Sequence, residues 1–321
     1  MADYNTIRGL RVRYLSAEPS NPEDGQVWYN STTGNLRVDG IAVAGSWASG
    51  GAAPRGLASG SLAGVQTSAM MWGGDTGGAP PGWPLASYSY NGTSWTGAGD
   101  IPSPVRATTG QFGAGAPTAA AYGGFNTPGV VTIEYNGSAW GAGGSLNDSR
   151  EYAYNTGGGT QTAGIAIGGG PSQAVHEHYN GTAWTQKTSF PSGANSLYAI
   201  GSQGATLGVS GGNGTTASWD GSAWTGSPVT LGSPRDGGAA GGSSSTNGYV
   251  FGGGSTPTQN NTTFFNGTSW AANPTMANNR SSTGGTGIQS NALLAGSFYN
   301  GNTAVEEFTA PSVVAKNVSV S

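Results

Sequence analysis

The residues with the clearest chemical potential are the chain's only two histidines. His176 and His178 flank Glu177 in the segment VHEHYNG. Alternating residues of a strand face the same side, so the two imidazoles could together bind a metal ion. The sequence shows no third ligand nearby, and the segment aligns with VTIEYNG at 131–137 and ASYSYNG at 86–92. We therefore expect the pair to belong to a repeated strand, and we expect neither a metal site nor a cofactor.

A second candidate is a set of arginines that recurs at one place along the chain. Each follows a tryptophan by 8 to 11 residues: Arg55, Arg106, Arg150, Arg235 and Arg280. Arginines that converge with a pair of acids could bind and cleave an acidic sugar. Recurrence at one equivalent place instead predicts a structural role, in which the guanidinium groups donate to backbone carbonyls between repeats. The acids Glu134, Glu177 and Glu307 likewise recur at what we interpret as like positions, so we expect no catalytic residues.

An internal repeat explains this recurrence. YNGTSW at 90–95 returns as YNGSAW at 135–140 and YNGTAW at 179–184, and looser copies are WDGSAW at 219–224 and FNGTSW at 265–270. The tryptophans that mark the repeat are 48, 45, 44, 40 and 46 residues apart: Trp47, Trp95, Trp140, Trp184, Trp224 and Trp270. Intervals of about 40 to 50 residues are typical of propeller blades. We expect these tryptophans to pack between neighbouring blades.

Each repeat divides into four strands. A Gly-rich strand follows the arginine, an apolar strand ends in a glycine pair such as that at 73–74, and a third strand leads through Asn-Gly to the tryptophan strand. Asn-Gly between apolar runs predicts a type I′ hairpin, in which both central residues have positive φ. The small residues of the first two strands are expected on innermost strands, where side chains crowd a central axis.

Counting the units predicts an all-β fold, a six-bladed β-propeller. Six units begin near positions 55, 106, 150, 195, 235 and 280, and the last runs to Pro311 without a tryptophan. Trp47 stands before the first unit. Its strand can complete the blade that begins at Arg280, so that strands from both termini close the ring. Seven blades remain an alternative if residues 27–47 form most of a further blade.

Composition excludes several classes of protein. The 60 glycines and 17 prolines amount to roughly twice average usage, whereas charged residues make up only 8%. A net charge of −4 without a basic patch predicts no nucleic-acid partner. The absence of cysteine excludes disulfides and thiolate metal sites. The sequence has neither a long apolar run nor the apolar core of a secretory signal, so we expect no membrane insertion and no Sec-dependent export.

The repeat resembles the kelch family of β-propellers. The resemblance rests on the glycine pair, the aromatic residue before the turn and the tryptophan at a spacing of about 45 residues. It covers residues 47–313 and implies a kelch-like propeller domain with those bounds. The copies are richer in glycine and poorer in charge than typical kelch blades, so no partner specificity is carried over.

The N-terminal region resembles a different group of proteins. GQVWYNSTTGNLRV at 25–38 is similar to segments of tail-fibre and other virion proteins of tailed bacteriophages, especially those of marine hosts. The resemblance implies that residues 1–46 form an attachment segment with a β-hairpin. Residues 314–321 alternate in polarity and are expected to add a strand to a sheet edge, in this chain or another. The residues expected to attach to other virion proteins are Arg8, Arg11, Arg13, Trp28 and Tyr29.

Aromatic residues outside the repeat are the candidates for partner binding. We expect Trp72, Trp83 and Trp219 to make such contacts. Trp83 lies in APPGWPL, an insertion in the longest unit. Loops on a rigid scaffold carry recognition more often than the scaffold itself, which makes this insertion a candidate contact surface. The alternative is that its prolines and Trp83 pack the loop onto the blade.

Together these features predict a non-enzymatic virion protein. The leading hypothesis is a fibre-type tail appendage that displays the propeller in several copies and recognises a glycan or protein on the host surface through avidity. The alternatives are a capsid decoration or a purely structural tail protein. A glycan-degrading propeller enzyme and a cellular kelch-like adaptor are less favoured hypotheses.

Overall fold

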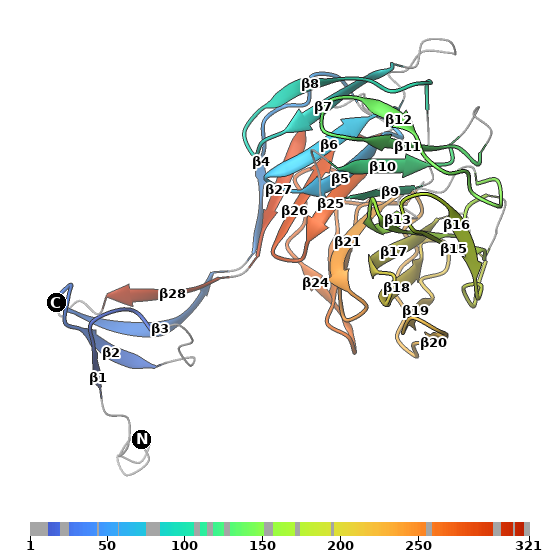
Figure 1. Ribbon diagram of the computed structural model, residues 1–321. Helices are drawn as coiled ribbons and strands as arrows, with labels where there is room; N and C mark the ends of the chain where they lie inside the picture. The colour runs from blue at the N-terminus through green and yellow to red at the C-terminus, as the bar shows by residue number, and fades with distance from the viewer. Residues whose placement is uncertain are drawn as a thin grey trace. The chain divides into compact units, whose positions relative to one another are not determined.

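The structure is a computed structural model in which every regular element of the described residues is a β-strand (Figure 1). It describes residues 12–19, 26–43, 45–56, 58–74, 84–105, 110–113, 118–124, 129–150, 157–170, 174–193, 196–254, 259–297, 303–310 and 312–317. The chain forms two compact units, one made of Met1–Gly45 with Ala310–Ser321 and the other of Ser46–Thr309. Within the described residues, no helix has the length and apolar character needed to span a membrane.

The larger unit contains six four-stranded antiparallel sheets among its described residues. The first three sheets are β5 (Ser61–Val65), β6 (Ser68–Trp72), β7 (Ala86–Tyr90) and β8 (Trp95–Asp100); β9 (Gly110–Gly113), β10 (Ala119–Tyr122), β11 (Thr132–Tyr135) and β12 (Trp140–Ala142); and β13 (Gly157–Thr160), β14 (Ala163–Ile167), β15 (His176–Tyr179) and β16 (Trp184–Lys187). The next three are β17 (Leu197–Ser202), β18 (Ala205–Ser210), β19 (Thr216–Trp219) and β20 (Trp224–Gly226); β21 (Ala239–Ser244), β22 (Asn247–Phe251), β23 (Thr262–Phe265) and β24 (Trp270–Asn273); and β25 (Gly284–Ile288), β26 (Asn291–Ala295), β27 (Val305–Thr309) and β4 (Ser46–Ser49).

The order of strands gives this unit a propeller-like all-β fold. Each sheet runs through consecutive strands, except that β4 supplies the fourth strand beside β27, with Trp47 opposite Phe308. This pairing joins the two ends of the unit, as the position of Trp47 in the sequence predicts. The first strands pack against one another in the order β5, β9, β13, β17, β21 and β25, and β25 also packs against β5 (Figure 1).

The first strands are as crowded as their small residues predict. A Cβ at Gly158 would lie 2.9 Å from the carbonyl oxygen of Ala199 on the first strand of the next sheet. Gly201 has a φ of 104°, and a Cβ there would collide with the carbonyl oxygen of Ala205 across its own hairpin. Glycine is required at such a position because other residues rarely adopt positive φ and have no space for a side chain.

The Asn-Gly loops differ from the predicted type I′ turns. Tyr90 pairs with Trp95, so four residues form the loop, and Asn91 Oδ1 accepts hydrogen bonds from the backbone N–H groups of Thr93 and Ser94. The same contacts recur at Asn136, Asn180, Asp220 and Asn266. Among the described residues other than glycine, only Ser59 and Ser282 have positive φ. The type I′ prediction is therefore wrong, because the Asn or Asp side chain closes the turn and only the glycine needs positive φ.

The hydrophobic core lies between neighbouring sheets, and it corrects two of the predicted binding residues. Trp72 is fully buried in a cluster that includes Ala119 and Ala121 of the next sheet. Trp219 is 2% exposed. Both side chains are packed inside the unit and are not available to a partner, so the prediction that they form contacts is wrong. Trp83, the third predicted binding residue, lies outside the described residues.

The smaller unit is a four-stranded sheet built from both ends of the chain. Its strands, in spatial order, are β1 (Arg13–Leu15), β2 (Val27–Asn30), β3 (Asn35–Val43) and β28 (Ser312–Asn317). The β2–β3 pair is the predicted hairpin, and β28 adds an antiparallel strand to β3 of the same chain. The predicted segments 1–46 and 314–321 thus contribute to one unit, because the C-terminal strand β28 pairs with the edge of β3 in the N-terminal hairpin.

The residues predicted to attach to other virion proteins have different environments in this sheet. Trp28 is fully buried, which removes it as a contact residue and makes it part of the core. Arg13 is exposed, and the half-buried ring of Tyr29 lies 5.0 Å from the ring of Tyr14. Arg8 and Arg11 lie outside the described residues.

Candidate functional site

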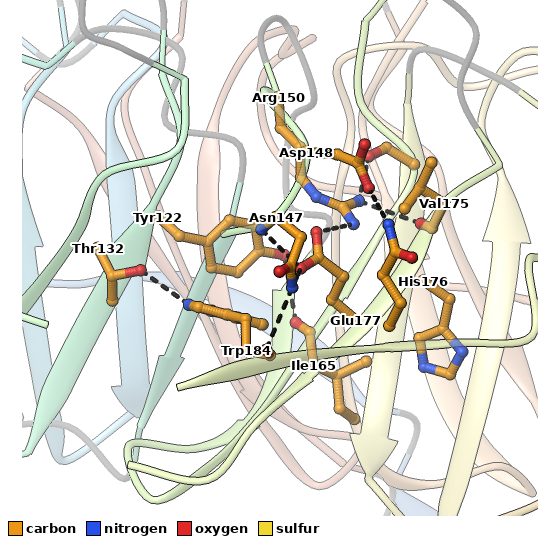
Figure 2. Close-up of polar contacts among 12 residues, drawn as sticks. Tyr122, Thr132, Asn147, Asp148, Arg150, Ile165, Val175, His176, Glu177 and Trp184 are labelled. Atoms are coloured by element: carbon orange, nitrogen blue, oxygen red, sulfur yellow. Dashed lines mark hydrogen bonds and ion pairs between the residues drawn. The ribbon is translucent and has the colours of Figure 1, made fainter. Parts of the chain in front are cut away.

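The repeated arginines bind backbone carbonyls of their own sheet. Arg150 is fully buried; its Nη1 donates to the carbonyls of Gly168 and Val175, the latter at 3.1 Å, and its Nη2 donates to Glu177 Oε1 at 3.0 Å (Figure 2). Gly168 follows β14 and Val175 precedes β15. The arginine therefore ties together the second and third strands of one sheet. The prediction that the arginines donate to backbone carbonyls is confirmed. The prediction that these hydrogen bonds link different repeats is wrong, because the acceptors belong to the arginine's own sheet.

The other described arginines repeat this arrangement with different third partners. Arg280 Nη1 donates to the Gly296 and Ala304 carbonyls at 3.0 and 3.1 Å, and its Nη2 lies 2.7 Å from Glu306 Oε1. In the neighbouring sheet, Arg235 donates to the hydroxyl of Thr263 instead of a carboxylate. Arg55 donates to the Gly73 carbonyl at 2.6 Å. Arg106 lies outside the described residues.

The acids fall into two structural groups, which corrects the interpretation that Glu134, Glu177 and Glu307 are equivalent. Glu177 and Glu306 each lie two residues before the last aromatic of the third strand and pair with the arginine of their sheet. Glu134 and Glu307 lie one residue before that aromatic and bind a tyrosine of the next sheet. The side chains of adjacent strand residues face opposite sides, so a shift of one position changes the partner completely.

The second group of acids joins neighbouring sheets. Tyr90 of β7 donates to Glu307 Oε1 of β27 at 2.5 Å. Burial and this hydrogen bond raise the pKa of Tyr90 to about 12. Burial and the bond to Glu134 likewise raise the pKa of Tyr179 to about 12. Both tyrosines keep their protons at neutral pH and serve as donors between sheets.

The repeat tryptophans also join neighbouring sheets, as predicted. Trp184 Nε1 donates to the hydroxyl of Thr132 in the preceding sheet at 2.9 Å (Figure 2). The same indole-to-hydroxyl bond links Trp140 to Ser87, Trp270 to Thr216, and Trp47 to Thr262. In every case the hydroxyl is three residues before the last aromatic of the third strand.

Two tryptophans depart from this pattern for a clear reason. The residue at the hydroxyl position is His176 in the sheet that precedes Trp224 and Val305 in the sheet that precedes Trp95. Neither side chain has a hydroxyl. Both indoles donate instead to a backbone carbonyl, Trp224 to Thr188 and Trp95 to Gly51.

A further bridge between sheets was missed by the sequence analysis. Gln203 Nε2 donates to the carbonyls of Gly164 and Tyr179 in the preceding sheet at 2.9 and 2.7 Å. Gln161, Gln289 and Gln66 reach back to the preceding sheet in the same way. The signal is present in the sequence, because Gln66, Gln161 and Gln289 each stand seven residues before the first glycine of the glycine pair or its weakened copy.

The histidine pair forms an aromatic cluster. The ring centroids of His176 and His178 are 4.6 Å apart, and the His176 ring lies 4.8 Å from Trp219 of the next sheet. Burial lowers the pKa of His176 to about 3, aided by the charge of His178, and burial lowers the pKa of His178 to about 4. Both imidazoles are therefore neutral at pH 7. Within the described residues, no group of three or more His, Cys, Asp or Glu side chains could hold a metal ion.

The first strands line a partly open cavity of about 170 Å³. Its walls come from five of the sheets and consist mainly of glycine, alanine and backbone, for example at 63–65, 199–201 and 285–288. The lining residues carry no ionisable side chain. The described lining residues thus offer backbone polar groups, apolar side chains and the Thr286 hydroxyl to a ligand, and no acid–base group.

Comparison with known proteins supports the fold. No protein-family model matches the chain, and no curated protein matches it. Among solved structures, one described as the structure of YjhT superposes with a TM-score of 0.60 over 83% of this chain and 99% of that chain, at 14% sequence identity. At this level of identity the similarity shows a shared fold alone. The fold places the chain among all-β, propeller-like proteins.

Proposed function

We propose that this chain is a non-enzymatic virion protein of a tailed bacteriophage that displays a six-bladed, kelch-like propeller for host recognition. The observation that supports the proposal is that the side chains capable of chemistry are engaged in structural contacts. The described Arg, Glu, His, Gln and Trp side chains of the repeat bond or pack within and between sheets. They serve the scaffold, which leaves recognition to the exposed loops and the exposed outer strands.

The arrangement of sheets supports six blades in a closed ring. Each of the six sheets of Ser46–Thr309 has four strands, and the packing of the first strands returns from β25 to β5. Residues 27–43 contribute β2 and β3 to the smaller unit, which argues against a seventh blade. The pairing of β4 with β27 supplies the join between the two ends.

The outer surface supports a role in display. The fourth strands β4, β8, β12, β16, β20 and β24 are largely exposed, and Asp100 and Lys187 are their charged residues. A surface of Thr, Ser, Asn, Gly and Ala is suited to weak, multivalent contact with a glycan or protein. Several copies on one particle would then supply the avidity that single sites lack.

The smaller unit is suited to attachment. It gathers both chain ends into one sheet and exposes Val12 (43%) and Tyr14 (78%) beside Arg13. This assignment predicts that Arg13→Glu with Tyr14→Ser reduces incorporation of the chain into particles. Lys187→Glu, a charge reversal on the exposed strand β16, is the matched control and should leave incorporation unchanged. Equal incorporation of both variants would contradict the assignment.

Host binding is tested with fluorescent full-length protein displayed in many copies on beads. We expect saturable binding to a restricted set of aquatic bacteria and competition by unlabelled protein. The absence of competable binding from a broad panel would contradict host recognition and favour a capsid decoration or structural tail protein. Cleavage of host polysaccharide by the purified chain would contradict the non-enzymatic assignment.

A further inference from the structure

The two histidines lie at one boundary between sheets. His176 and His178 project from β15 toward the sheet β17–β20, where the His176 ring lies 4.8 Å from Trp219 and 5.3 Å from Trp224. His176 is fully buried and His178 is 9% exposed. The chain has no other histidine, so no other boundary in the unit shares this chemistry.

A second proton on either imidazole would have no acceptor here. His176 Nδ1 lies 3.2 Å from the carbonyl oxygen of Thr188 and must carry its hydrogen, because a carbonyl only accepts. The Nε2 atoms of both histidines are buried without a hydrogen-bond partner among the described residues. Protonation would place an N–H donor in an aromatic environment, which is costly without a partner.

The charged groups around the pair also oppose protonation. Lys187 pairs with His176 across β15 and β16, and its charge lowers the pKa of both histidines. Arg150 contributes in the same direction at His176. Glu177 could offset these charges, but it points to the opposite side of β15 and is bound by Arg150 (Figure 2). The strands β19 and β20 contribute indoles and no charged side chain at this boundary.

Other boundaries have a neutral hydrogen bond at the same place. Thr132, Thr216 and Thr262 occupy the position of His176 and each accept a hydrogen bond from a tryptophan. Those bonds do not change between pH 8 and 5, because neither indole nor hydroxyl titrates there.

We propose that the boundary between the sheets β13–β16 and β17–β20 is acid-sensitive and opens before the other boundaries of Ser46–Thr309 as the pH falls. Opening exposes both imidazoles to water, where they bind protons with ordinary affinity. The closed boundary binds these protons only at much lower pH. Its stability is therefore complete above pH 6.5 and is lost progressively toward the closed-state pKa values of about 4 and 3.

The proposal is tested by hydrogen exchange of the full-length protein at pH 7.5 and 5.0, corrected for the intrinsic pH dependence of exchange. Each histidine should raise the opening constant by about 30-fold over this range. We expect peptides from 174–190 and 214–226 to lose protection, whereas peptides from 130–142 at the preceding boundary keep it. Uniform loss of protection, or no loss, would overturn the proposal.

Substitution identifies the groups that titrate. His176→Thr with His178→Ser introduces the residues found at 216 and 218 in the next sheet and should abolish the pH dependence while preserving the fold. If that variant fails to fold, His176→Asn with His178→Asn removes the titration with less change in volume. Persistence of the pH-dependent opening in a folded variant would show that other groups cause it and would overturn the proposal.

Discussion

At the scale of residues, the fold of this protein depends on positions where only one residue type fits the contact with a neighbouring strand. Gly201 adopts a φ of 104° beside the Ala205 carbonyl, and Trp184 reaches the Thr132 hydroxyl 52 residues earlier in the chain. Such positions tolerate little change, because the backbone or hydroxyl that they contact belongs to a rigid strand. Their sensitivity distinguishes them from chemically identical residues in open loops.

Gly201→Ala should destabilise the protein by about 2 kcal/mol or more, since it combines positive φ with a backbone collision. Gly204→Ala in the turn of the same hairpin is the control, because a Cβ there meets nothing within 4 Å. It should change stability by less than about 0.5 kcal/mol. Urea unfolding of both variants checks the difference. Equal stability would mean that the hairpin relaxes to accommodate the side chain.

A double-mutant cycle measures the bond between Trp184 and Thr132. Trp184→Phe and Thr132→Val each remove one partner of a buried hydrogen bond and should cost about 1 to 3 kcal/mol. The double variant should cost less than the sum by about 1 kcal/mol, because neither partner is then left unpaired. Additive losses in urea unfolding would show that the bond contributes nothing to the contact between the sheets.

At the scale of elements, the third strand of each sheet distributes the contacts. Positions are counted back from its last aromatic residue. A Glu at position one binds a tyrosine of the next sheet, a Glu or Thr at position two binds the arginine of the same sheet, and a Ser or Thr at position three accepts a hydrogen bond from the tryptophan of the next sheet. Where the residue type changes, the bond changes with it, as His176 shows. The sequence reveals the strand, but the register decides which position performs which task.

Arg280→Met should destabilise the protein by about 3 to 5 kcal/mol, because it leaves Glu306 buried without its cation. Arg280→Met with Glu306→Leu should recover much of this loss. Arg55→Met, at the equivalent place with no carboxylate partner among the described residues, should cost less. Denaturant unfolding of the three variants checks this order. A double variant less stable than Arg280→Met would show that the ion pair itself is strongly stabilising.

At the scale of the whole molecule, both units use strands from opposite ends of the sequence. Thr309 pairs with Ser46 in the larger unit, and Ser312 pairs with Val43 in the smaller one. Along the chain, two residues lie between Val43 and Ser46, and two lie between Thr309 and Ser312. Pairing of β3 with β28 therefore shortens the chain closure needed for β4 to meet β27, and closure entropy grows with the length of the loop.

Removal of residues 312–321 should weaken the pairing of β4 with β27 by roughly 3 kcal/mol at most, since closure then spans the whole larger unit. Removal of residues 1–15 is the control, because it takes away β1 and leaves the β3–β28 pairs. Hydrogen exchange of 46–49 and 305–309 checks the effect. Equal protection in both truncated chains would contradict the coupling.

Sequence patterns determined the repeat period, the four strands of each repeat, the N-terminal hairpin and the pairing of the Trp47 strand with the end of the larger unit. The first three depend on turn residues and on alternation between near neighbours in the chain, and the pairing of the Trp47 strand follows from counting the repeats. The tertiary structure decided which side chain meets which partner. It separated Glu177 from Glu134, buried Trp72 and Trp219, and joined β28 to β3. Such contacts depend on register and packing between residues far apart in the chain, where a shift of one residue moves a side chain to the other face of its strand.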